Sequence, residues 1–111
     1  MARNASWTAE ELILALDLYF RLPSTKASEH DPRVVELGRI LHRKPAAVYM
    51  KMRNYLRFEG KKERMGLSRG AKMEAAIWRG FGVDRPLLRR TAKAIIERLK
   101  GTTSPQESFR L

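Results

Sequence analysis

The sequence lacks cysteine and contains only two histidines, His30 and His42. The absence of cysteine excludes disulfides, thiolate zinc sites and cysteine nucleophiles, and it suits a reducing cytoplasm, where we expect the protein to lie near the nucleoid. Two histidines are too few for a nuclease centre of the HNH type or a histidine-based metal site, so we expect no metal and no other cofactor. No run of about 18 apolar residues occurs, so we expect neither a membrane span nor a membrane partner.

Acidic residues are scarce, because 12 Asp and Glu stand against 23 Lys and Arg and leave a formal net charge of +11. Residues 1–38 hold four basic and six acidic residues, whereas residues 39–72 hold eleven basic and two acidic residues, a net charge of +9. Residues 73–111 hold eight and four. A surface tuned only for solubility mixes the two signs more evenly. The basic middle third therefore favours nucleic acid as the partner, with a solubilising surface or an acidic protein partner as alternatives.

Apolar residues recur at helical spacing, and no alternating strand pattern competes with them, so the sequence predicts a compact all-α bundle of about five helices. Thr8 and Glu11 form a capping box ahead of a helix that runs to about Arg21. We expect one domain over residues 1–100 and a flexible tail or linker over 101–111. Further helix starts are marked by capping residues or by proline, at Asp31-Pro32, Pro45, Ser68 and Asp84-Arg85-Pro86. The fourth helix is expected to bury Met73, Ile77, Trp78 and Phe81.

The two helices expected at about 32–41 and 45–57 are separated by the three-residue turn His42-Arg43-Lys44, which is the layout of a helix-turn-helix pair. A helix that begins at Pro45 has Lys44 as its N-cap, and a lysine side chain accepts no hydrogen bond from the free N–H groups. Those donors and the positive end of the helix dipole are then open to a phosphate group, unless water satisfies them.

The next helix start, Ser68-Arg69, repeats this arrangement, and a basic loop joins the two. We therefore predict a surface that grips the DNA backbone. Its expected contacts are His42, Arg43, Lys44, Tyr49, Lys51, Arg53, Lys61, Lys62, Arg64, Ser68, Arg69 and Lys72. Most carboxylates stand at helix starts, where they act more often as dipole partners than as general bases. We predict no catalytic residue and do not expect an enzyme.

Four separate segments resemble a known family in their order and spacing. They are Trp7–Tyr19 (WTAEELILALDLY), Pro32 with Glu36-Leu37, Pro45–Tyr55 (PAAVYMKMRNY) and Gly66–Arg69 (GLSR). Across about residues 5–81 the chain resembles the domains found ahead of HNH nuclease modules in McrA-like restriction endonucleases, most closely their DNA sulfur-binding domains. The resemblance implies the targeting part of a modification-dependent restriction system, with an HNH nuclease module in the same or a partner chain.

The resemblance also implies a ligand, double-stranded DNA with phosphorothioate linkages, in which sulfur replaces one non-bridging phosphate oxygen. In that family a small nonpolar pocket within a basic surface holds the sulfur. The positions of this chain that match the pocket are Lys44, Pro45, Val48 (or Ala47), Arg69 and Arg3. Sulfur is less strongly hydrated than an anionic oxygen, so a pocket of CH and CH₂ groups favours sulfur.

Two other functions stay open from the sequence. A reader of a modified base such as methylcytosine needs an aromatic cage or a deep polar pocket, for which Tyr49 and Tyr55 are the candidates. A basic protein-interaction domain that positions a partner nuclease is the second alternative. The affinities for one duplex with and without a phosphorothioate, and with methylcytosine, separate these possibilities.

Overall fold

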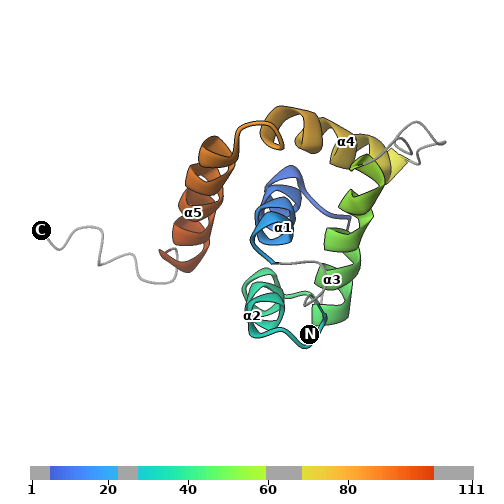
Figure 1. The fold of residues 1–111 in the computed structure, drawn as a ribbon. Coiled ribbons are helices and arrows are strands. Elements are labelled where there is room, and N and C mark those ends of the chain that lie inside the picture. The colour runs from blue at the N-terminus through green and yellow to red at the C-terminus, as the bar shows by residue number, and fades with distance from the viewer. Residues whose placement is uncertain (1–5, 23–27, 60–68, 102–111) are drawn as a thin grey trace, which may run out of the picture.

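In the computed structural model, residues 6–22, 28–59 and 69–101 are described, the first three residues of the last range by their backbone alone (Figure 1). They form α1 (Ala9–Arg21), α2 (Pro32–Leu41), α3 (Pro45–Asn54), a 3-10 helix η1 (Tyr55–Phe58), α4 (Arg69–Phe81) and α5 (Arg85–Gly101). No strand occurs within these ranges, so the predicted all-α bundle is confirmed. None of the described helices is both long and apolar enough to cross a bilayer.

Capping residues start the helices where the sequence predicts. The Thr8 hydroxyl accepts a hydrogen bond from the Glu11 N–H at 3.2 Å, and the Glu11 carboxylate accepts one from the Thr8 N–H at 2.9 Å. Asp31 and Asp84 each accept a backbone N–H in the first turn of α2 and α5. Each of these bonds satisfies a donor that a helix start leaves without an intrahelical partner.

The core is built around α1, which lies in the middle of the bundle (Figure 1). Every residue from Glu11 to Leu18 is buried. α3, α4 and α5 pack on α1, while α2 packs mainly on α3. The largest side chains with almost no exposure are Tyr55, Leu12, Leu16, Leu18, Met52, Leu88, Val34 and Val48. Because α1 is central, its first turn serves as an anchor for the neighbouring elements.

α4 departs from its predicted stripe at one position. Ile77 is buried and Trp78 packs against the core, but Met73 is 43% exposed. Glu74 is buried in its place at 2% exposure, and its carboxylate accepts a hydrogen bond from Lys51 Nζ at 2.9 Å. An ion pair therefore joins α4 to α3 where the sequence pattern predicts an apolar contact.

The turn between α2 and α3 is tight because Gly38 has no side chain. The Arg43 N–H donates to the Gly38 carbonyl oxygen at 2.8 Å. His42, at the corner, has a φ of 60° in the left-handed region. A Cβ at residue 38 would lie 2.6 Å from the Arg43 carbonyl oxygen and 3.4 Å from Pro45 N. The backbone of the turn thus passes as close to α2 as glycine allows.

We expect Gly38→Ala to lower the free energy of unfolding by about 1–3 kcal/mol, since the added methyl group meets backbone atoms that must shift. Gly80→Ala in α4 is the control, because a Cβ there meets nothing within 4 Å. Alanine favours a helix over glycine, so this control should be neutral or stabilising by up to about 1 kcal/mol. Urea denaturation measures both variants, and equal effects would contradict the close approach at Gly38.

Candidate nucleic-acid interface

The start of α3 has the geometry that the sequence predicts. Lys44 is the N-cap residue, and its side chain makes no capping hydrogen bond. Lys44 and Ala46 are exposed, and the Pro45 ring is half-buried. The N–H groups of Ala47 and Val48 donate to the Lys44 carbonyl oxygen. The Ala46 N–H has no acceptor within the described part of the chain. The helix start therefore combines a free donor, the positive dipole end and an exposed cation, which together suit an anion.

Arg43 holds this turn against the start of α1. Its guanidinium donates to the Glu11 carboxylate at 2.9 and 3.1 Å and to the Ser6 carbonyl oxygen at 3.1 Å. It lies 4.5 Å from the centre of the Trp7 ring, and its side chain is 3% exposed. The prediction that Arg43 contacts DNA is therefore wrong, because these partners enclose the guanidinium. Arg43 instead fixes the backbone that leads into Lys44.

Val48 does not line a surface pocket as the resemblance implied, because it is 0% exposed on the core side of α3. At this position of the helix, Val48 belongs to the apolar stripe of α3 that faces α1. Ala47, the other residue considered for this position, is half-buried. The small apolar surface beside the Pro45 ring is formed by Ala46 and Ala47.

The starts of α3 and α4 lie far apart. α4 begins beside η1, at the opposite end of α3 from Pro45 (Figure 1). α3 has ten residues, which corresponds to a length of about 15 Å. Arg69 begins α4 at that far end, and its side chain is outside the described part, so its predicted place in the pocket stays a prediction. Of the predicted pocket residues whose side chains are described, Lys44, Pro45 and the alternative Ala47 lie together at the start of α3.

The solvent side of α3 carries four residues at spacings of three and four, namely Ala46, Tyr49, Met50 and Arg53, and we call this surface the α3 face. Met50 is 57% exposed. The Arg53 guanidinium donates to the Tyr49 hydroxyl at 3.3 Å and lies 5.8 Å from the centre of its ring. Apolar groups beside a cation suit contact with both thymine methyl groups and the acceptors of the major groove.

Sequence reasoning found Tyr49 and Arg53 but missed Met50 and Ala46. Their spacing along the helix could have identified them. Met50 is four residues after Ala46, and it lies outside the buried stripe of Val48 and Met52. Charge counting draws attention to cations and passes over an exposed methionine. A helical projection of the segment places Met50 on the solvent side.

Lys51 lies on the other flank of α3, toward α4. Its Nζ is 2.9 Å from the Glu74 carboxylate and 5.5 Å from the centre of the Trp7 ring. Its side chain is only 20% exposed, whereas that of Glu74 is 3% exposed. Lys51 therefore neutralises a buried carboxylate, which would lose its counter-charge if the ammonium group moved away, and its predicted contact with DNA stays a prediction.

The remaining predicted contacts divide into two groups. His42 and Lys72 are exposed and available to a ligand. Arg3, Lys61, Lys62, Arg64 and Ser68 lie outside the described residues.

Tyr55 is unavailable for an aromatic cage around a base. It is 0% exposed, and its hydroxyl donates to the Leu12 carbonyl oxygen at 3.0 Å. Burial raises the pKa of Tyr55, so the hydroxyl stays a hydrogen-bond donor at neutral pH. The predicted pair of Tyr49 and Tyr55 is thus wrong, because Tyr55 belongs to the core and only Tyr49 reaches the α3 face.

The described residues offer no site for a metal ion, and the comparisons name no relative. Across residues 6–22, 28–59 and 69–101, no group of three His, Cys, Asp or Glu residues could hold a metal ion. Comparisons of the chain with protein-family models, with curated proteins and with solved structures found no match. The function is therefore argued from the start of α3 and the α3 face.

Proposed function

We propose that this protein binds double-stranded DNA, with the start of α3 at a backbone phosphate and the α3 face against the base edges. The observation that carries this proposal is the exposed helix start at Lys44, where a cation occupies the N-cap position without capping the helix. The net charge of +11 supports a polyanionic partner. The buried contacts of Arg43 support the proposal as well, since a phosphate site needs its donors held in place before binding.

We further propose that the bound group is a phosphorothioate. The resemblance to DNA sulfur-binding domains supports this ligand, and so does the apolar surface of the Pro45 ring, Ala46 and Ala47 beside the helix start. Sulfur loses little hydration against such groups, while the remaining non-bridging oxygen accepts the Ala46 N–H and faces the Lys44 ammonium. In an unmodified phosphate both non-bridging atoms are oxygens, so one anionic oxygen would lie against apolar carbon, which is unfavourable. The protein would then be the targeting part of a modification-dependent restriction system, with an HNH nuclease module in the same or a partner chain.

The experiment compares one duplex in three forms: unmodified, with a single phosphorothioate, and with methylcytosine. We expect the phosphorothioate duplex to bind about tenfold more tightly than the other two, since one apolar contact in a pocket is worth roughly 1–3 kcal/mol. Equal affinity for all three forms would overturn sulfur recognition and leave general DNA binding. A preference for methylcytosine would favour a base reader, and no binding to any duplex would favour a protein-interaction domain.

We expect DNA affinity to fall steeply with salt. Residues 39–72 have a net charge of +9, and those of their cations that are not paired with buried carboxylates should neutralise several phosphates, each of which adds about 0.9 to the slope of log affinity against log salt. Titrations of the unmodified duplex between about 50 and 200 mM salt should give a slope magnitude of about 3 or more. A magnitude below about 2 would contradict a broad contact with the DNA backbone.

A further inference from the structure

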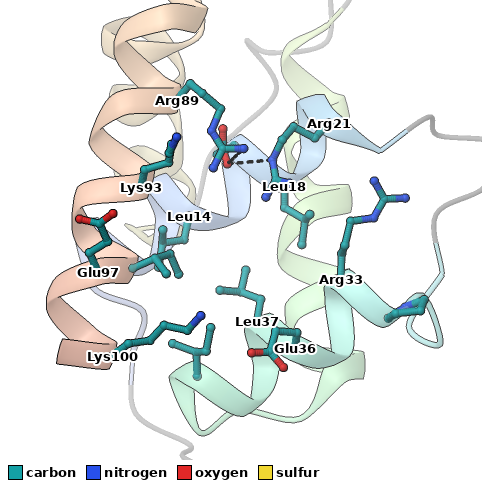
Figure 2. Close-up of a pocket in the computed structure, with 14 residues that line it drawn as sticks. Leu14, Leu18, Arg21, Arg33, Glu36, Leu37, Arg89, Lys93, Glu97 and Lys100 are labelled. Atoms are coloured by element: carbon teal, nitrogen blue, oxygen red, sulfur yellow. Dashed lines mark hydrogen bonds and ion pairs between the residues drawn. The ribbon is translucent and has the colours of Figure 1, made fainter. Parts of the chain in front are cut away.

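A cleft of about 500 Å³ lies between α1, α2 and α5 (Figure 2). Its lining residues come from these three helices and none from α3. Clefts that hold small organic ligands measure roughly 300–1,000 Å³. The cleft is therefore large enough for such a ligand and is separate from the proposed DNA site.

The floor of the cleft is apolar. It is formed by leucine and isoleucine side chains from all three helices, namely Leu14, Leu18, Leu37, Ile40 and Ile96. The three leucines are buried, and the two isoleucines are half-buried at the open side. The floor thus offers an apolar surface that an apolar chain or ring system could cover.

One end of the cleft has an excess of positive charge. Arg21, Arg89 and Lys93 lie at this end (Figure 2), and Asp17 also lines the cleft. Arg21 Nε and Arg89 Nη1 lie 3.0 and 3.3 Å from Asp17 Oδ2. Lys93 has no ion pair within the described residues, and Arg89 Nε is buried there without a hydrogen-bond acceptor. Three cations against one carboxylate leave a net charge of +2 at this end, which suits an anion.

The other carboxylates of the rim leave this excess in place. Glu36 lines the cleft, and its carboxylate is paired with Arg39 Nη2 at 2.6 Å. Glu97 points away from the apolar floor in Figure 2. Cations therefore outnumber carboxylates at the end of Arg89 and Lys93, while the rest of the cleft combines the apolar floor with a rim of both signs, formed by Arg33, Glu36, Glu97 and Lys100.

We propose that this cleft binds a small amphipathic anion, a medium-chain carboxylate, with its head group at Arg89 and Lys93 and its chain on the apolar floor. The cations at one end of the cleft suit an anionic head group, and the apolar floor suits a hydrocarbon chain, so a ligand that has both groups fits best. Such a ligand joins α2 to α5 across α1, and a ligand that binds only the folded state stabilises it. The inference does not depend on the proposed DNA function.

The test uses isothermal titration of the full chain with decanoate, with decanol and inorganic phosphate as ligands that each carry one of the two features. We expect decanoate to bind one to one and to raise the melting temperature, and the other two to bind at least about tenfold more weakly. Phosphate binding as tightly as decanoate would overturn the proposal, because the apolar floor would then contribute nothing. Displacement of decanoate by duplex DNA would also overturn it, by placing the anion at the start of α3.

Variants locate the site. Lys93→Glu should weaken decanoate binding about tenfold or more, because it replaces a head-group cation by a like charge. Arg90→Glu is the matched control, since Arg90 is an exposed cation of the same helix that does not line the cleft. Ile40→Trp should fill the space above the apolar floor and weaken decanoate binding, while all cations of the cleft remain. Equal losses for Lys93→Glu and Arg90→Glu, or full binding by Ile40→Trp, would contradict a ligand in this cleft.

Discussion

Arg43→Met should lower the free energy of unfolding by about 3–5 kcal/mol, because it removes the guanidinium that donates two hydrogen bonds to the buried Glu11 carboxylate. Glu11 is 4% exposed and accepts two hydrogen bonds from the Arg43 guanidinium. Methionine fills much of the volume of the arginine stem, so most of the loss comes from the charge. Urea denaturation of the variant and of the unmodified protein measures the difference.

Arg39→Met is the matched control, since it breaks the exposed pair of Arg39 and Glu36. Its loss should stay below about 1 kcal/mol, the usual value of a surface ion pair. The double variant Arg43→Met with Glu11→Leu should recover part of the stability, because the buried carboxylate is removed together with the guanidinium. Recovery should be incomplete, since the Thr8 N–H loses its acceptor in the capping box. A loss in Arg43→Met no larger than in Arg39→Met would show that Glu11 finds water in the folded protein.

The helix starts could be predicted because their signals are local. Thr8 and Glu11 are three residues apart, and the Asp31-Pro32 and Lys44-Pro45 pairs each lie at the helix boundary that they set. The Lys44 N-cap followed from the order of two neighbouring residues, without knowledge of the tertiary fold. At its other end α3 stops at Asn54 and continues as η1 to Phe58, close to the predicted end near residue 57.

The partners of the cations could not be predicted, because they are distant in sequence. Arg43 pairs with Glu11 across 32 positions, and Lys51 pairs with Glu74 across 23. From the sequence both looked like part of a basic surface, and both instead neutralise buried carboxylates. A charge count gives the net charge of a segment but not which cations remain for a ligand. The same limit hid the exposure of Met73, since the inward residue of this turn is Glu74, which is paired with Lys51.

The start of α3 supplies the sharpest test of sulfur recognition, because one substitution changes its apolar surface and leaves its cations in place. The Pro45 ring lies beside Ala46 at an N-terminus that has no side-chain cap. Serine is tolerated in the first turn of a helix, so Pro45→Ser should fold. Its hydroxyl places a polar, hydrated group where the sulfur is proposed to lie.

We expect Pro45→Ser to weaken binding of the phosphorothioate duplex about tenfold or more, since one lost apolar contact is worth roughly 1–3 kcal/mol. Affinity for the unmodified duplex should change little, because Lys44, Arg53 and the helix dipole remain. Arg53→Ala is the control on the same helix, and it should weaken both duplexes by a similar factor and keep their ratio. Both affinities are measured at one fixed salt concentration, because the electrostatic contribution varies steeply with salt. A ratio left unchanged by Pro45→Ser would place sulfur recognition away from the start of α3, even if this surface binds DNA.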